Sequence, residues 1–239
     1  MALAFLILPL LALASDRSEA ETPQEPGAPH GGEDHHHGGH GEEGRHGVHH
    51  DFSDAEKWAA IFEGDDRDSW QKPQEVVELM DLRPGMRVAD LGAGSGYFLP
   101  YLSRAVGTEG RVLGLDPEPN LVTYMTRRAR DGGWSNVEAR KIPLDSPGLG
   151  DGSTDRILIV NTWHHIEDRS VYAARLLRTL AADGRVYVVD FTRESPYGPS
   201  VESRLPPDQV LRELLAGGFE AERLETSLPW QYVIVARRP

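Results

Sequence analysis

The stretch Val88-Ala89-Asp90-Leu91-Gly92-Ala93-Gly94-Ser95-Gly96-Tyr97-Phe98 decides the fold and carries the most specific signal in the chain. Its first residues have the apolar character of a buried strand, and they lead into a Gly-x-Gly-x-Gly turn. Glycine tolerates positive φ and lets the backbone approach a ligand closely. A helix that begins near Tyr97 would point its free N–H groups toward the same place. The stretch therefore predicts a loop that binds a nucleotide-like cofactor.

An acidic residue supports this interpretation. Asp116 directly follows the next predicted strand, and a carboxylate at that position can accept hydrogen bonds from both hydroxyls of a ribose. The dinucleotide fingerprint Gly-x-Gly-x-x-Gly requires a third glycine where this chain has the bulky Tyr97. A nicotinamide cofactor is therefore disfavoured, although a nicotinamide-dependent oxidoreductase stays an alternative. We interpret Tyr97 as a packing residue of the cofactor loop rather than a catalytic phenol.

Strands and helices alternate around this loop. Hydrophobic patterns predict strands at 87–91, 111–115, 136–141, 156–160, 185–191, 220–225 and 232–237. They predict helices at 53–62, 74–80, 119–130, 171–180 and 207–216, a loop and helix at 92–106, and a polar turn at 65–73. No helix separates the last two strands, so they should form a hairpin. The pattern predicts an α/β, doubly wound, mostly parallel sheet with helices on both faces.

The chain divides into three segments by composition: 1–15, 16–51 and 52–239. Met1–Ser15 is apolar but shorter than the roughly 20 residues of a membrane-spanning helix. It fits a secretory signal, with a small-x-small cleavage pattern at Ala12-Leu13-Ala14, although no Lys or Arg precedes the apolar run. We expect a periplasmic or secreted protein without a membrane span in the mature chain. The alternatives are a cytoplasmic protein and an uncleaved N-terminal anchor.

The segment 16–51 is rich in Gly, Glu, Pro and His and has almost no large apolar side chains, so we expect it to be disordered. Its histidines are His30, His35, His36, His37, His40, His46, His49 and His50. Clustered imidazoles bind divalent metals when they are neutral. The segment is therefore either a weak divalent-metal binder or a plain pH-sensitive linker.

Composition excludes several classes of function. The chain has 239 residues and a formal net charge of −13, which disfavours a nucleic-acid substrate. It has no cysteine, so disulfides, thiolate nucleophiles and cysteine-ligated zinc are excluded. We expect no metal site in the domain 52–239. The lack of cysteine does not identify the compartment.

The region from about Lys72 to Arg238 resembles the class I S-adenosylmethionine-dependent methyltransferases, and within them the small-molecule, type 11-like group. The resemblance implies a seven-stranded sheet of order 3-2-1-4-5-7-6 that ends in an antiparallel hairpin. It implies S-adenosyl-L-methionine as the cofactor. The segment around Trp70 and Lys72 resembles the entry helix that closes over this cofactor.

The resemblance also implies roles for individual residues. The methionine end of the cofactor would be lined by Asp90, Gly92, Ala93, Gly94 and Gly96, with Tyr97 beside them. Asp116 would hold the ribose, Pro117 would lie near the adenine, and Asn161 would lie beside the methionine portion. One position departs from the family, because no Asp follows the third strand. Glu138 or the backbone near Arg140 would replace it at the adenine amino group.

Two histidines follow the fourth predicted strand, in Asn161-Thr162-Trp163-His164-His165. Residues at the carboxyl end of such a strand face the ligand crevice, and histidine suits proton removal from a methyl acceptor. His165 is the first candidate for a general base and His164 the second, whereas either one can instead be structural. Asp168 is expected to cap the next helix and Arg169 to be a surface charge.

The function that we predict is methyl transfer to a small-molecule acceptor. DNA amino-methyltransferases of similar fold place an Asp/Asn/Ser-Pro-Pro-aromatic motif where this chain has Asn161-Thr162-Trp163-His164, and arsenite methyltransferases rely on cysteine thiolates. Both classes are disfavoured. Gly94-Ser95-Gly96-Tyr97 also resembles protein isoaspartyl methyltransferases, which stay a weaker alternative. A second hypothesis is an exported His-rich metal-binding protein whose methyltransferase fold is inactive.

Overall fold

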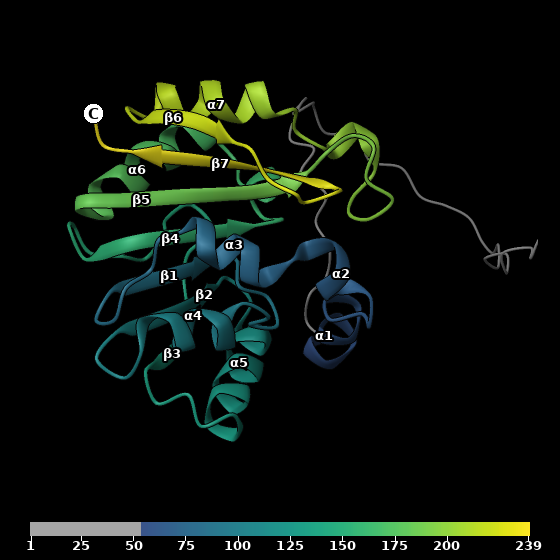
Figure 1. Ribbon diagram of the computed structural model, residues 1–239, viewed down its shortest axis with the longest axis vertical. Helices are drawn as coiled ribbons and strands as arrows, with labels where there is room; N and C mark the ends of the chain where they lie inside the picture. The colour runs from purple at the N-terminus through teal and green to yellow at the C-terminus, as the bar shows by residue number, and fades with distance from the viewer. Residues whose placement is uncertain (1–53) are drawn as a thin grey trace, which may run out of the picture. The chain divides into compact units, whose positions relative to one another are not determined.

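A single seven-stranded sheet organises the protein (Figure 1). The structure is a computed structural model that describes residues 54–239. The strand order is β3-β2-β1-β4-β5-β7-β6, as expected from the family resemblance. The strands are β1 (Arg87–Leu91), β2 (Arg111–Asp116), β3 (Val137–Lys141), β4 (Thr154–Val160), β5 (Leu180–Phe191), β6 (Glu220–Leu224) and β7 (Gln231–Arg237). Only β7 pairs antiparallel with its neighbours, β5 and β6, which confirms the predicted hairpin.

Helices cover both faces of the sheet, because successive residues of each inner strand are buried on opposite sides. Val88 of β1 packs into one core cluster, whereas Ala89 and Leu91 pack into the other. The first cluster includes side chains of α3 (Pro73–Leu79), α4 (Leu99–Val106) and α5 (Pro119–Asp131). The second includes those of α6 (Arg169–Thr179) and α7 (Pro207–Ala216). The doubly wound architecture is therefore confirmed.

The strand order reverses at β1, which lies between β2 and β4. Parallel strands share one carboxyl edge, and ligands of such sheets bind at that edge where the order reverses. The loops that follow β1, β2, β4 and β5 meet there. They contain residues 92–98, 117–118, 161–168 and 192–206. The fold thus brings every predicted site residue except Asp90 and Arg140, which lie within β1 and β3, into these loops or next to them.

The local pattern predicts only a polar turn at 65–73, whereas the family resemblance implies a helix around Trp70 and Lys72, and the structure has the helix. After α1 (Ala55–Phe62), the chain forms a second short helix, α2 (Arg67–Gln71). Trp70 and Gln71 are buried, so this segment packs against the rest of the domain. Local polarity misled the prediction because the burial comes from residues far away in the sequence.

Other elements begin at different residues than expected. α4 begins at Leu99 rather than near Tyr97. β5 begins at Leu180 because Thr154 pairs with Leu180 before a register shift. Asp168 occupies the N-cap position of α6 with φ 45°, but its side chain makes no capping hydrogen bond. Arg169 is no plain surface charge, because its Nε donates to Glu213 Oε1 at 2.9 Å.

The segments 1–15 and 16–51, together with residues 52–53, lie outside the described part of the chain. The predicted signal, the metal-binding linker and the exact start of the domain all fall there. Within residues 54–239, no helix combines the length and the apolar character that crossing a membrane requires.

The cofactor loop should tolerate alanine less at Gly96 than an open position elsewhere does. Gly96 has φ +78°, and a Cβ there would lie 2.7 Å from Leu99 Cδ1, whereas Gly133 has φ +68° with nothing within 4 Å. Alanine at either position should lower the free energy of unfolding by about 1–2 kcal/mol, because the left-handed conformation strains its side chain. Only Gly96→Ala should lose about 1–3 kcal/mol more, from overpacking. Urea unfolding should therefore show a larger loss for Gly96→Ala, and equal losses would contradict this account.

Candidate active site

The turn after β1 is fastened to the end of β2. The backbone N–H groups of Gly92 and Ala93 both donate to Leu115 O, at 2.8 and 3.0 Å. Gly92 has φ +71°, and a Cβ there would lie 2.3 Å from Thr162 Cγ2. Only glycine therefore permits β1 and the loop after β4 to approach this closely. Gly94 and Gly96 also have positive φ, as the sequence pattern predicts.

Asp116 faces this turn. Its Oδ2 accepts a hydrogen bond from Gly94 N and its Oδ1 accepts one from Glu118 N, both at 2.9 Å. Burial raises the pKa of Asp116 to about 6, while the two backbone donors oppose this shift. A carboxylate has about four lone-pair sites, so two further donors can bind. The carboxylate therefore has acceptor sites left for the hydroxyls of a ribose, and that contact stays a prediction.

Asp90 is the second buried acid of the turn, and 3% of its surface is exposed. Burial raises its pKa to about 7, with a smaller opposing effect from the charge of Arg67 and a reinforcing one from Asp116. Because charges are costly in the interior, such a group is a candidate to meet a cation of a ligand. Its contact with the methionine end of the cofactor stays a prediction.

Tyr97 lies beneath α2. Its hydroxyl donates to Asp68, and the guanidinium of Arg67 lies 3.9 Å from its ring centroid. Burial raises the pKa of the phenol, so the hydroxyl stays protonated. These contacts support the interpretation of Tyr97 as a packing residue, and they reveal Arg67 as a cation beside the loop that sequence reasoning missed.

Asn161 follows β4 with φ 54°, and its backbone N–H donates to Val189 O at 2.8 Å. Its Oδ1 accepts a hydrogen bond from Gln231 Nε2 at 2.7 Å, and Gln231 Oε1 accepts one from Gln71 Nε2 at 2.7 Å. A chain of amides thus joins Asn161 to α2. Asn161 Oδ1 is engaged by Gln231, so the predicted contact of Asn161 with the methionine portion would use its side-chain N–H groups.

The two residues predicted near the adenine lie differently. Pro117 follows Asp116 directly and is partly buried at the carboxyl edge. The Arg140 side chain instead pairs with Glu138, which also pairs with Arg111 at the start of β2. These two arginines lower the pKa of Glu138 to about 2. Glu138 is therefore engaged in ion pairs, which leaves the backbone near Arg140 as the better candidate for the adenine amino group.

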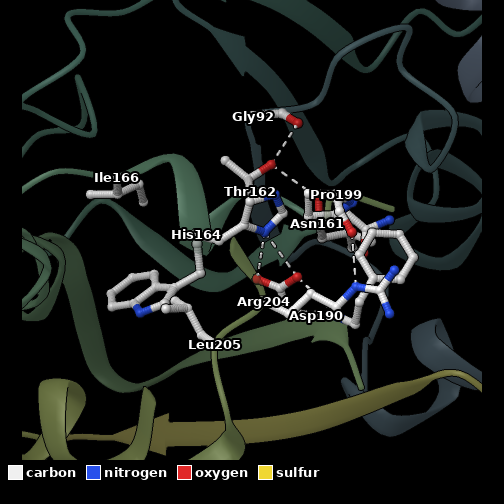
Figure 2. A network of polar contacts seen from close by, with 12 residues as sticks. Gly92, Asn161, Thr162, His164, Ile166, Asp190, Pro199, Arg204 and Leu205 are labelled. Atoms are coloured by element: carbon white, nitrogen blue, oxygen red, sulfur yellow. Dashed lines mark hydrogen bonds and ion pairs between the residues drawn. The ribbon is translucent and has the colours of Figure 1, made fainter. Parts of the chain in front are cut away.

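The two candidate histidines differ in environment (Figure 2). His164 Nδ1 lies 3.0 Å from both carboxylate oxygens of Asp190, and the side chains are only 5% and 3% exposed. His165 is exposed, with its ring centroid 4.2 Å from that of His164. The structure thus singles out His164, the second candidate of the sequence, as a buried histidine with a carboxylate partner.

Sequence reasoning missed Asp190, although one signal was present. Asp190 is the penultimate residue of β5, so it lies at the same sheet edge as the loop after β4. Beyond it, the loop 192–206 is held by Arg204, which is 8% exposed. This guanidinium donates to five backbone oxygens, those of Thr192, Arg193, Ser195, Tyr197 and Pro199. No pattern in the sequence indicates this role for Arg204.

The site fits an adenosyl cofactor. A glycine turn allows close approach, a buried acid with spare acceptor capacity ends β2, and a second buried acid lies in β1. Within residues 54–239, no three His, Cys, Asp or Glu side chains are grouped so as to hold a metal ion.

Comparison with known proteins identifies the family. The type 11 family model described as "Methyltransferase domain" matches residues 89–188. A structure titled as a SAM-dependent methyltransferase from Aquifex aeolicus aligns with TM-score 0.72 and 26% identity, and covers 77% of this chain and 97% of its own. The chain belongs to the class I S-adenosylmethionine-dependent methyltransferases. S-adenosylmethionine is its cofactor, and the predictions of family, fold and cofactor are confirmed.

Curated relatives match this methyltransferase over about half of its length. Phosphoethanolamine N-methyltransferase 1 of Arabidopsis thaliana is 31% identical over 54% of this chain and 26% of its own length. The ubiquinone/menaquinone biosynthesis C-methyltransferase of Teredinibacter turnerae is 28% identical over 52% of this chain and 49% of its own length. The chain spans only a quarter to a half of these relatives, so their acceptors are not transferred to it.

The buried acid of β1 should make the methyltransferase less stable as the pH rises. The pKa of Asp90 is about 7 in the folded chain and 3.8 ordinarily, so between these values the folded state holds a proton that the unfolded state has lost. Unfolding free energy should fall by roughly 2–3 kcal/mol between pH 5 and 8 relative to Asp90→Asn. Denaturant titrations at both pH values measure this difference.

The exposed Asp151→Asn is the matched control, because it should leave the pH dependence as it is in the unmodified chain. Parallel pH profiles for the unmodified chain and Asp90→Asn would contradict the assignment of a proton to Asp90.

Proposed function

We propose that this methyltransferase acts on a small-molecule acceptor that gives up a proton, and that His164 receives this proton. The observation that carries the proposal is the buried pair of His164 and Asp190. Its Nδ1–Oδ distances are 3.0 Å to both carboxylate oxygens. A carboxylate that holds one imidazole nitrogen is the arrangement that prepares the other nitrogen for proton transfer.

The pairing selects the tautomer of His164. A carboxylate only accepts hydrogen bonds, so Nδ1 carries the hydrogen and Nε2 keeps its lone pair. Asp190 is itself oriented, because its Oδ1 accepts a hydrogen bond from Phe191 N at 2.9 Å. When Nε2 takes a proton, the imidazolium is stabilised by the adjacent carboxylate charge.

The pair lies close to the cofactor loop. Thr162 precedes His164 by two residues, and its Oγ1 lies within hydrogen-bonding distance of Gly92 O at 3.3 Å and of Val160 O at 3.0 Å (Figure 2). The loop after β4 thus carries the proton acceptor while it touches the loop that binds the cofactor. An acceptor bound at the loop after β4 would therefore lie next to the cofactor.

The chemistry follows from these positions. When bound, S-adenosylmethionine supplies an electrophilic methyl group and leaves as a neutral thioether. Gly92–Gly96 and Asp116 would hold the cofactor, and His164 Nε2 would accept the proton that the acceptor loses from O–H, N–H or an activated C–H. Proton removal is general to these acceptors, so the pair does not select among them.

Two features support a small molecule rather than a macromolecule. The net charge of −13 disfavours nucleic acid. Relatives are named for phosphoethanolamine and for quinone biosynthesis.

The acceptor class can be tested with the full chain and S-adenosylmethionine labelled in its methyl group. A hydroquinone, a catechol and phosphoethanolamine are suitable acceptors, and we expect label in at least one of them. Label in added protein or nucleic acid, with none in the small molecules, would refute the proposal.

Replacing His164 should slow the reaction without weakening the binding of the cofactor. His164→Gln is expected to lower kcat by about 100- to 10,000-fold, the usual contribution of a positioned base. Asp190→Asn should also lower kcat, because an amide does not hold the same tautomer. Affinity for S-adenosylhomocysteine, measured by calorimetry, should change by no more than about twofold in either variant.

His165→Gln is the matched control, because this neighbouring side chain is exposed. We expect its kcat to stay within about threefold of the unmodified chain. A large loss for His165→Gln together with full activity of His164→Gln would reverse the assignment of the two histidines.

We also propose export of the chain, on the sequence of Met1–Ser15 alone. Mass spectrometry of the native protein should find a mature N-terminus just after Ala14, and an intact Met1 would refute cleavage.

The alternative of a His-rich metal binder is tested by deleting residues 30–50. Unchanged uptake of Zn²⁺ or Ni²⁺ by the deletion variant would remove that alternative.

A further inference from the structure

Arg67 lies over the cofactor loop with part of its hydrogen-bonding capacity unused. It is the first residue of α2, and its guanidinium lies 3.9 Å from the ring centroid of Tyr97. One terminal nitrogen donates to Phe62 O, and the other donates to Gln71 Oε1 at 3.3 Å. The third nitrogen, Nε, is buried and has no hydrogen-bond partner in the structure. A buried N–H without a partner is costly, so this group calls for an explanation.

The charge of Arg67 is also uncompensated at close range. Within residues 54–239, none of the ion pairs includes it. Burial lowers its pKa to about 10, although the charges of Glu63, Asp68 and Asp90 act in the opposite direction. An arginine fork with free donors in such surroundings suits a planar anion, and a carboxylate fits it best.

Phe62 connects Arg67 to the glycine turn. The ring of Phe62 lies 3.2 Å from the point where a Cβ on Gly94 would be, so the end of α1 lies directly against the glycine turn. Arg67 holds the backbone oxygen of that same Phe62. Its charge also interacts with that of Asp90, in the strand that leads into the turn. Arg67, in α2, and Asp90, in β1, thus both lie beside the glycine turn.

We propose that Arg67 binds the α-carboxylate of the methionine moiety of S-adenosylmethionine, opposite the acid Asp90, which meets its α-ammonium group. The cofactor has one anion and one cation at this end, and the site has one cation and one anion. The two buried charges of the protein would thereby be neutralised by the ligand. This inference rests on the cofactor of the family and is independent of the acceptor and of His164.

Calorimetry on the full chain with three thioether ligands tests the proposal. S-adenosylhomocysteine has both charged groups, its decarboxylated analogue lacks only the carboxylate, and 5′-methylthioadenosine lacks both. On the unmodified chain, removal of the carboxylate should weaken binding by about 10- to 100-fold, the value of a hydrogen-bonded charge. Equal affinity for S-adenosylhomocysteine and its decarboxylated analogue would overturn the proposal without any variant.

Arg67→Met provides the second arm. This variant should bind S-adenosylhomocysteine about 10- to 100-fold more weakly than the unmodified chain does, while its affinity for 5′-methylthioadenosine should stay within about twofold. In this variant, S-adenosylhomocysteine and its decarboxylated analogue should bind with similar affinity. Equal weakening of all three ligands would show that Arg67 only supports the fold, and would overturn the proposal.

Arg128→Met is the matched control, because Arg128 also touches the loop, through Ser95 O at 3.0 Å, but pairs with Glu63. It should affect S-adenosylhomocysteine and 5′-methylthioadenosine alike. If the unmodified chain bound none of the three ligands, the cofactor assignment itself would fail. If it bound all three equally, only the role of Arg67 would fail.

Discussion

The turn between β1 and α4 is the constraint on which the rest of the structure depends. Leu115 O accepts the N–H groups of both Gly92 and Ala93, and Asp116 accepts that of Gly94. The end of β2 therefore determines the path of the loop. Thr162 then fills the space that a side chain at Gly92 would need. Three strand ends are thus fixed against one another, and the backbone between them is the part that a nucleoside can approach.

The same region concentrates buried charge. Burial raises the pKa values of Asp90 and Asp116 and lowers that of Arg67, so the protein alone holds these groups at a cost. Elsewhere in the described chain, ion pairs such as Arg87–Asp155 and Arg237–Glu220 are solvent-exposed and cost little. Buried acids with strongly shifted pKa values that cluster at one sheet edge are typical of a binding site, because a bound ligand can offset the cost of burying them.

The fold class was predictable because its signals are local, whereas the strand order came from the family resemblance. The glycine turn, Asp116 and the final hairpin each follow from short patterns, and the carboxyl-edge rule places the glycine turn and Asp116 together. α2 does not follow from the local pattern, because Arg67–Gln71 is polar and its buried residues are held from far away; only the family resemblance implied a helix around Trp70 and Lys72. Gln71 bonds to Gln231, 160 residues later in the chain. His164 and His165 are likewise indistinguishable in sequence, and only the position of Asp190 at the end of β5 separates them.

α2 also shows why the two halves of the site are not independent. Arg67 and Asp68 contact Tyr97 in the loop after β1, whereas Asp66 and Trp70 contact Tyr197 in the loop after β5. A helix of five residues makes too few internal hydrogen bonds to be stable by itself. Its conformation therefore requires both loops to be in place. The cofactor loop and the loop beside Asp190 are consequently joined by an element whose own order depends on each of them.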